Sequence, residues 1–156
     1  MEEQLLIRDS IPDDYKVLTS LIGELGYPAD EEKVRKRLEK IDADKNAKTL
    51  VAEFNGRVVG FVGLHKSYGY ESDGCFVRIT ALVTSEAYRG KGIGTRLVQA
   101  AEEWAEKEKA SCIVLSSRLD REEAHGFYKN RGFALTGYSF VKKISGEDPA
   151  AREGDY

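Results

Sequence analysis

Residues 81–98 read Ala-Leu-Val-Thr-Ser-Glu-Ala-Tyr-Arg-Gly-Lys-Gly-Ile-Gly-Thr-Arg-Leu-Val and contain the most informative pattern of the chain. An apolar run typical of a β-strand ends within it, and three alternating glycines, Gly90, Gly92 and Gly94, lead into an amphipathic helix. Such glycines leave backbone N–H groups uncovered at a helix N-terminus, where the unpaired amides and the helix dipole both favour an anion. The stretch therefore predicts a turn that binds a phosphate group between a strand and a helix.

The spacing of the glycines excludes two common classes of phosphate-binding motif. A Walker A loop needs Gly-Lys-Ser/Thr after its second glycine, and a dinucleotide fingerprint needs a third glycine where Thr95 stands. The remaining pattern, Arg89-x-x-Gly92-x-Gly94 between a strand and a helix, resembles the signature of the GNAT superfamily of N-acetyltransferases, Gln/Arg-x-x-Gly-x-Gly/Ala. A nucleotide-binding module is an alternative that explains the glycine turn alone.

A second block, residues 120–133, resembles the other hallmark of the GNAT superfamily, an Ala-x-x-x-Tyr spacing followed by Gly-Phe. Helical spacing places Ala124 and Tyr128 on one face. Many members carry an asparagine where this chain has Arg121, and the variant Arg-x-x-Ala-His-x-Phe-Tyr is similar to the branch that contains aminoalkylphosphonate and aminoglycoside acetyltransferases. We expect His125 within this block to be a structural hydrogen-bonding residue rather than a base.

The resemblance implies acetyl-CoA as the cosubstrate and implies which residues bind it. The pyrophosphate would lie on the glycine turn and the pantetheine arm along the end of the preceding strand. The cofactor-binding residues expected on this basis are Leu82, Val83, Thr84, Arg89, Gly90, Lys91, Gly92, Ile93, Gly94 and Thr95. Tyr128 is expected to be the general acid that protonates the leaving thiolate. No spacing of His, Cys and Asp fits a zinc site, so no metal is expected.

The function that this resemblance implies is transfer of an acetyl group from acetyl-CoA to the primary amine of a small molecule, by direct attack in a ternary complex. Two further alternatives stay open: a non-catalytic acyl-CoA-binding or sensing module, and an acetyltransferase that acts on a protein or peptide amine. The presence of Tyr128 favours catalysis, whereas the strand before the glycine turn lacks the carboxylate that some relatives use as a base.

Candidates for the base and for the acceptor site lie in loops and strands around the glycine turn. The amine must lose a proton, because an alkylamine has a pKa of about 10.4. Glu71 or Asp73 is the candidate base, and Glu24 near the end of the first helix is a further candidate; an ordinary solvated acid is the alternative for each. Tyr27 and Arg78 are the candidate substrate-binding residues, and Arg78 would favour an acceptor that carries a phosphonate or carboxylate group.

The composition suits one soluble domain. The chain has 156 residues, of which 41% are hydrophobic and 33% charged, and its net charge of −3 argues against nucleic-acid binding through bulk electrostatics. The acidic N-terminus and the absence of a long apolar run predict neither a signal peptide nor a membrane span, so we expect a cytoplasmic location. Cys75 and Cys112 are expected to be buried, reduced thiols. A homodimer is the oligomeric state that the resemblance suggests.

The pattern of apolar residues predicts the order strand, two helices, three strands, helix, strand, helix and two strands. Strands are expected at residues 5–8, 49–54, 57–64, 76–84, 112–115, 133–135 and 138–141, with Asn55-Gly56 as a two-residue hairpin turn and residues 112–115 as a central strand. Ser10 or its neighbours, Asp30 and Asp120 are expected to cap helices, and Gly26 to end one.

This order predicts an α+β fold, with a mixed, mostly antiparallel central sheet flanked by helices in three α/β/α layers. The same order is similar to that of the GNAT superfamily from end to end. We expect residues 1–144 to form a single N-acetyltransferase domain and residues 145–156 to form a disordered tail.

Overall fold

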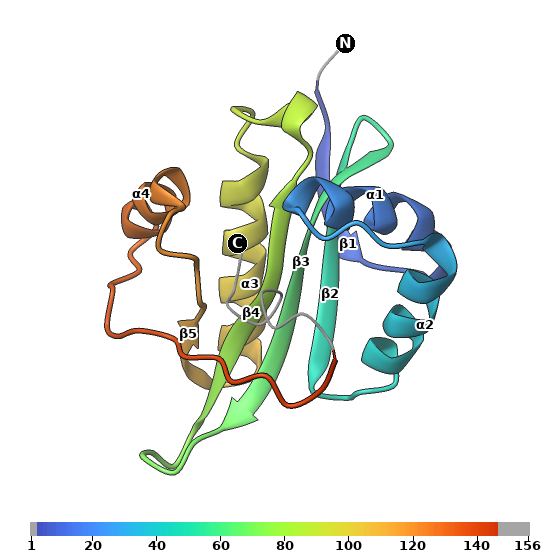
Figure 1. Cartoon of the computed structure of the whole chain (residues 1–156). Coiled ribbons are helices and arrows are strands. Elements are labelled where there is room, and N and C mark those ends of the chain that lie inside the picture. The colour runs from blue at the N-terminus through green and yellow to red at the C-terminus, as the bar shows by residue number, and fades with distance from the viewer. Residues whose placement is uncertain (1–2, 147–156) are drawn as a thin grey trace. The chain divides into compact units, whose positions relative to one another are not determined.

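The computed structural model describes residues 3–146, and Figure 1 shows the path of the chain. The strands are β1 (Leu5–Asp9), β2 (Ala47–Phe54), β3 (Arg57–Tyr68), β4 (Cys75–Thr84) and β5 (Ala110–Val114). The α-helices are α1 (Tyr15–Leu25), α2 (Glu31–Asp42), α3 (Ile93–Lys107) and α4 (Glu122–Asn130), with 3-10 turns at Pro12–Asp14 and Glu86–Tyr88. The chain divides into two compact units, the first ending at Val114 and the second beginning at Leu115.

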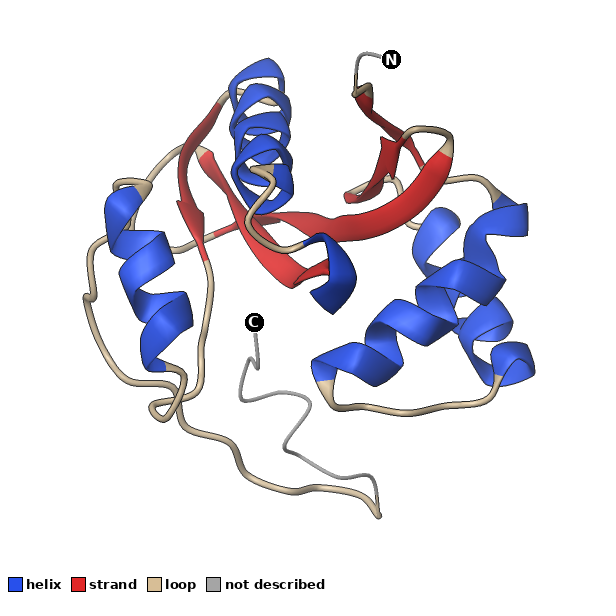
Figure 2. Cartoon of the chain, turned by 90° about the horizontal axis from the view of Figure 1, so that it is seen from above, coloured by secondary structure: helices blue, strands red, loops and turns tan. Residues whose placement is uncertain are grey.

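The first unit consists of three layers. Its sheet has the order β1-β2-β3-β4-β5, and all neighbours are antiparallel except for the parallel pair β4–β5. The helix α3 covers one face of the sheet, and α1 and α2 cover the other (Figures 1 and 2). This arrangement confirms the predicted mixed, mostly antiparallel sheet in three α/β/α layers.

The strand β5 lies at the edge of the described sheet, whereas the sequence predicted a central strand. Its residues are half-buried or exposed, and Cys112 is exposed, while Cys75 in β4 is buried. The prediction of a buried Cys112 is therefore wrong. The physical reason is that β5 pairs with β4 alone in the described sheet, so its short apolar run is not enclosed.

The helix α3 packs its apolar stripe directly against the sheet. The buried side chains of this stripe are Ile93, Leu97, Val98, Ala101 and Ala105. Gly60 of β3 lies beneath them, and a Cβ at that position would be 2.8 Å from the Val83 carbonyl oxygen and 3.2 Å from Leu97 Cδ1. Only glycine therefore allows the helix to approach the sheet so closely.

The strand β4 contains a β-bulge at Thr80. Gly63 of β3 pairs with Ala81, whereas the next residue, Leu64, pairs with Ile79, so the register skips Thr80. Paired residues share a face, and neighbours along a strand point to opposite faces. Ile79 therefore lies on the face that α3 covers and Ala81 on the opposite face, although simple alternation predicts one face for both. The bulge thus changes which side chains reach each face near the end of β4.

Local turn chemistry places the other ends of the elements in the first unit. Asn55 and Gly56 have φ angles of 52° and 82°, which confirms the predicted hairpin turn. Gly26, with a φ of 113°, ends α1, and the Asp30 carboxylate accepts the Lys33 N–H at 2.8 Å at the start of α2. The strand β3 continues to residue 68, so the loop before β4 is shorter than predicted.

One predicted helix cap agrees with the structure and one is wrong. The N-cap before the first 3-10 turn is Ile11, a neighbour of Ser10, and its N–H donates to the Asp14 carboxylate at 2.8 Å. The N-cap of α4 is Arg121 rather than Asp120. Asp120 instead accepts a hydrogen bond from Arg118 at 3.1 Å, so its carboxylate is used by a side chain rather than by the helix.

The second unit contains α4 but not the predicted closing hairpin. No strand occurs at residues 133–135 or 138–141, and the apolar side chains of Leu135, Tyr138 and Phe140 are exposed. A two-stranded hairpin that pairs with no third strand is marginal in water, and Gly137 lacks the Asn or Asp partner of a tight turn. Most of the predicted tail, residues 147–156, lies outside the described residues. No helix in the described part of the chain is long and apolar enough to cross a membrane.

An ion-pair network joins β1, β2 and the first 3-10 turn. The Arg8 guanidinium donates to both carboxylate oxygens of Asp14 at 2.8 and 3.0 Å and to Glu53 at 2.8 Å. Asp14, whose side chain is 8% exposed, also accepts the Ile11 N–H at 2.8 Å. Burial alone would raise the pKa of Asp14, but the hydrogen bonds from Arg8 and Ile11 and the charge of Arg8 outweigh it and lower that pKa.

We expect Asp14→Asn to lower the free energy of unfolding by about 2 kcal/mol at pH 7, because Arg8 loses its charged bidentate partner. The loss is smaller than for a fully buried pair, since Arg8 is 26% exposed and keeps Glu53. The lowered pKa makes this contribution fully present above the pKa of an unfolded aspartate, about 3.9, and lost as the pH falls below it. Urea unfolding at pH 7 and pH 3 measures both effects; an equal difference between variant and wild type at the two pH values would contradict them.

Candidate active site

The glycine turn connects β4 to α3 at one end of the sheet. Ser85 donates its N–H to the Val59 carbonyl at 2.7 Å, and the 3-10 turn Glu86–Tyr88 follows. Gly90 and Gly92 have φ angles of 81° and 79°, in the left-handed region that costs an L side chain roughly 1–2 kcal/mol. Gly92 is also the N-cap of α3. The backbone path of this turn therefore depends on glycine at both positions.

The turn presents a row of uncovered backbone amides. The first N–H group that bonds within α3 is that of Arg96, which donates to the Gly92 carbonyl at 3.1 Å. Within the described residues, the backbone N–H groups of residues 90–95 have no acceptor. A Cβ at Gly90 or Gly92 would meet no heavy atom within 4 Å, so open space surrounds both. This is the geometry of an anion site at a helix N-terminus.

Aromatic and charged side chains brace the turn. The Tyr88 ring packs edge-on against Phe54 at the end of β2, with 5.7 Å between ring centroids. Lys91 Nζ lies 5.5 Å from the same ring and 3.9 Å from the Glu3 carboxylate, and Arg89 is exposed. The two cations add positive potential beside the amides. The contacts of Phe54 with Tyr88 and Lys91 could not be predicted from the sequence, because the residues around Phe54 indicate only a strand.

The strands β4 and β5 separate on the way to the glycine turn. Their last pair is Arg78 with Val114, whereas β4 continues to Thr84. No strand of the described sheet therefore pairs with residues 79–84 on this side. An unpaired strand edge offers N–H and C=O groups to an extended ligand, as in β-strand addition. The free edge includes Leu82, Val83 and Thr84, the residues predicted to bind the pantetheine arm.

Arg78 lies where the two strands separate, on the face opposite to α3. Its side chain is exposed and forms no ion pair within residues 3–146. Across the β3–β4 ladder it pairs with His65, whose Nε2 lies 3.0 Å from Asp44 Oδ2 and whose Nδ1 lies 3.1 Å from Ser67 Oγ. The imidazole is therefore occupied by its own partners, and Arg78 presents an uncompensated cation.

The structure does not bring Glu71 and Asp73 to the glycine turn. Both are exposed in the loop before β4, whereas the turn follows the other end of that strand (Figure 1). The 10 residues of β4 span roughly 30 Å at about 3.3 Å per residue. The turn is the expected pyrophosphate site rather than the place where the amine reacts, so the role of Glu71 or Asp73 as the base stays a prediction. Glu24 lies much closer, because its Oε1 accepts the Glu86 N–H at 3.1 Å.

Tyr27 follows the end of α1 and is half-buried. Its N–H donates to the Ile22 carbonyl at 3.1 Å, which closes the last turn of the helix around Gly26. Glu24, three residues earlier, contacts the residues before the glycine turn. The loop of Tyr27 therefore lies at the same end of the sheet as that turn, and its role toward a substrate stays a prediction.

In the second unit, α4 carries the predicted general acid. Tyr128 is buried, and its ring packs edge-on against Phe127 and Phe133 with centroid separations of 5.6 and 5.9 Å. His125 Nε2 lies 2.7 Å from the Arg118 carbonyl oxygen, in agreement with the predicted hydrogen-bonding role. The catalytic role of Tyr128 stays a prediction.

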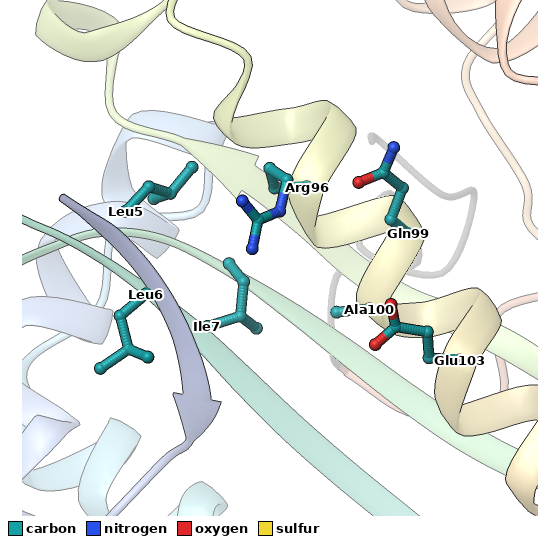
Figure 3. Close-up of a pocket in the computed structure, with 7 residues that line it drawn as sticks. All are labelled: Leu5, Leu6, Ile7, Arg96, Gln99, Ala100 and Glu103. Carbon is teal, nitrogen blue, oxygen red and sulfur yellow. The ribbon is translucent and has the colours of Figure 1, made fainter. Parts of the chain in front are cut away.

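A separate pocket of about 190 Å³ lies between β1 and α3 (Figure 3). The residues that line it are Leu5, Leu6, Ile7, Arg96, Gln99, Ala100 and Glu103. None of the predicted site residues is among them. In the sheet order, β2 and β3 separate β1 from β4, so this pocket is distinct from the free edge that leads to the glycine turn.

Known proteins with similar sequences are acetyltransferases. The model of the acetyltransferase (GNAT) family matches residues 14–133. The aminoalkylphosphonate N-acetyltransferase of Salmonella typhimurium is 33% identical over 101 residues, which cover 65% of this chain and 66% of that protein. The uncharacterized N-acetyltransferase YhdJ of Bacillus subtilis is 30% identical over 150 residues, which cover 91% of this chain and 97% of that protein.

Solved structures share the fold. A crystal structure of a GNAT family acetyltransferase from Staphylococcus aureus has a TM-score of 0.78 and 26% identity, covering 90% of this chain and 98% of that one. The aminoglycoside N-acetyltransferase AAC(6')-Iy, solved in complex with CoA, has a TM-score of 0.82 at 14% identity, covering 92% of this chain and 97% of that one. These solved acetyltransferases thus share the fold of this chain. The chain belongs to the acetyltransferase (GNAT) family, and it is an acetyl-CoA-dependent N-acetyltransferase.

Proposed function

We propose that this N-acetyltransferase acts on the primary amine of a small molecule that also carries a phosphonate or carboxylate group. The observation that carries the transfer chemistry is the row of uncovered N–H groups at residues 90–95, beside the free edge of β4. Arg78, an exposed cation with no ion-pair partner within residues 3–146, supports an anionic group on the acceptor. The Salmonella relative, named for aminoalkylphosphonates, supports the same class of acceptor.

In this proposal the glycine turn binds the CoA pyrophosphate and the edge of β4 binds the pantetheine arm. Arg89 and Lys91 supply positive charge, and the N–H groups from Gly90 to Thr95 supply hydrogen bonds. The amides of the pantetheine arm pair with the backbone of residues 82–84. Within residues 3–146, no three His, Cys, Asp or Glu side chains are grouped so that they would hold a metal ion.

The chemistry is a direct transfer without a covalent enzyme intermediate. The neutral amine attacks the thioester carbonyl carbon, a C–N bond forms, and the backbone N–H of Leu82, on the free edge of β4, stabilises the oxyanion. The C–S bond then breaks, and Tyr128 protonates the leaving thiolate. The amide nitrogen releases its extra proton, which restores the Tyr128 phenol through water.

The amine must also be deprotonated before it attacks. Because an alkylamine has a pKa of about 10.4, it arrives as an ammonium ion and passes one proton through water to a base. Glu71 or Asp73 is the candidate for this base. Glu24, the further candidate from the sequence, is exposed, and its Oε1 atom already accepts the Glu86 N–H.

Release of the CoA thiol from acetyl-CoA, measured across a panel of amines, tests the proposed function. The panel pairs each aminoalkyl phosphonate or carboxylate with the neutral alkylamine of the same length and includes a peptide with a free N-terminus. We expect thiol release and an acetylated product, detected by mass spectrometry, with the anionic small amines. Binding of CoA without turnover of any amine would favour the non-catalytic alternative, and acetylation of the peptide alone would favour a protein or peptide acceptor.

Arg78→Ala tests the recognition of the acceptor's anionic group. We expect the KM for an anionic amine to rise about tenfold, because a charge-assisted hydrogen bond is lost, while the KM for the neutral amine of the same length stays within about twofold. Arg37→Ala, which removes an exposed arginine from α2, is the matched control. Equal losses for the anionic and the neutral amine would remove Arg78 from the acceptor site.

We also propose a cellular location and an oligomeric state for the protein. A cytoplasmic location agrees with the two free cysteines in the described residues, Cys75 and Cys112. A homodimer is the expected oligomeric state, and light scattering coupled to size-exclusion chromatography measures it directly.

A further inference from the structure

Glu24 is an unusual residue for its place in the fold. It lies in the last turn of α1, which contains no basic residue, and an acid near a helix C-terminus is unfavourable for the helix dipole. The side chain is exposed, so burial does not explain why a glutamate occupies this position. Its Oε1 atom instead accepts the Glu86 N–H at 3.1 Å and lies 3.5 Å from Ser85 Oγ. The carboxylate thus leaves its own helix and bonds to the chain just after β4.

The position that Glu24 holds is the start of the segment that forms the glycine turn. Ser85 is fixed to β3 by its N–H bond to the Val59 carbonyl at 2.7 Å. From there the backbone folds into a 3-10 turn, in which Tyr88 N–H donates to the Ser85 carbonyl at 2.9 Å and Arg89 N–H to the Glu86 carbonyl at 3.3 Å. The N–H group that Glu24 accepts is therefore a free donor at the first residue of this turn, as in side-chain capping of a helix.

We propose that Glu24 is a positioning residue, whose carboxylate caps the turn before Gly90 and so sets the backbone path that presents the amides of residues 90–95 to CoA. This inference rests on the proposed function, because it takes the glycine turn as the CoA site. It also joins α1, and through it the loop of Tyr27, to the cofactor turn. An acceptor that orders this loop would then favour CoA binding, and CoA would favour the acceptor by the same factor.

The chemistry of the contact separates this role from proton transfer. A cap needs only an acceptor oxygen at the end of a side chain of this length, and glutamine supplies one. A general base needs a carboxylate, which neither glutamine nor alanine supplies. Positioning therefore predicts that Glu24→Gln recovers what Glu24→Ala loses, whereas a base predicts an equal loss of kcat in both variants.

Calorimetric titration with CoA and steady-state kinetics of wild type, Glu24→Ala and Glu24→Gln test the inference. We expect Glu24→Ala to weaken CoA binding about five- to tenfold, the size of one charge-assisted hydrogen bond, with kcat at saturating acetyl-CoA within about threefold of wild type. Glu24→Gln should bind CoA within about twofold of wild type. Glu102→Ala, which removes an exposed acid from α3, controls for the change of charge.

Each outcome bears on one proposal. If wild type does not bind CoA, the proposed function fails. If wild type binds CoA and Glu24→Ala binds it equally well, the inference about Glu24 is overturned and the proposed function stands. A loss of kcat in both variants with unchanged CoA affinity would also overturn it, in favour of a role as base. Circular dichroism and thermal unfolding of each variant confirm that the comparison is made between folded proteins.

Discussion

Replacing Tyr128 by phenylalanine is expected to lower kcat by about a hundredfold while the affinity for acetyl-CoA changes less than twofold. A positioned general acid contributes roughly 10²–10⁴-fold, and the substitution removes only the hydroxyl that would protonate the departing thiolate. Phenylalanine keeps the ring, and with it the edge-on contacts with Phe127 and Phe133. The packing of α4 should therefore persist, and the loss should appear in kcat rather than in binding. Single-turnover kinetics at saturating acetyl-CoA measure this step directly.

Tyr138→Phe is the matched control for that experiment, because Tyr138 belongs to the same compact unit and is exposed. It removes the same atom from a residue with no predicted role, so kcat should stay at the wild-type value. A kcat of Tyr128→Phe that matches wild type would assign Tyr128 to the packing of the second unit. A thiol with an ordinary pKa of about 8.5 would then leave with help from water alone.

The parts of the fold that could be predicted from sequence are those set by local chemistry. The left-handed conformations of Asn55, Gly56 and Gly26 and the cap at Asp30 each follow from one or two residues, and the structure confirms all of them. The bulge at Thr80 could not be predicted, because the apolar alternation of β4 continues through it without a local mark. Its position depends on the register with β3, which is a long-range property.

The pattern of apolar residues also predicted strands and burial that the described structure does not contain. Leu135, Tyr138 and Phe140 satisfy the pattern of a hairpin, yet the described structure leaves them exposed and outside any strand. The apolar run at Cys112 predicted a central strand, but its position at the edge of the described sheet exposes it. In both cases the pattern gives the tendency of a segment to extend, whereas burial depends on whether another strand covers it.

The candidate site likewise has one part that local sequence predicts and another that depends on contacts between distant segments. The glycine turn could be predicted because three closely spaced residues define its backbone, and its φ angles and open amides agree with that prediction. The surroundings of the turn could not. Phe54 and Glu24 reach it from β2 and α1, and only the fold brings these distant segments together. The acid in the last turn of α1 was the one available signal, because it opposes the helix dipole.

Replacing Gly92 by valine is expected to weaken CoA binding about a hundredfold. The φ of 79° at Gly92 is strained for any L side chain and most of all for a β-branched one, so the turn would shift away from its present path. The new side chain would also project into the open space around the turn, where the proposal places the pyrophosphate. Calorimetric titration with CoA measures the loss directly.

Gly56→Val provides the matched control, since Gly56 has a φ of 82° and equally open surroundings but lies in the β2–β3 hairpin. Both variants should lose a similar free energy of unfolding, about 1–2 kcal/mol, because both place a side chain in the left-handed region. Only Gly92→Val should lose CoA affinity. Equal losses of affinity in the two variants would attribute the effect to backbone strain. Wild-type affinity in Gly92→Val would mean that CoA binds elsewhere, because a pyrophosphate on these amides leaves no room for the valine side chain.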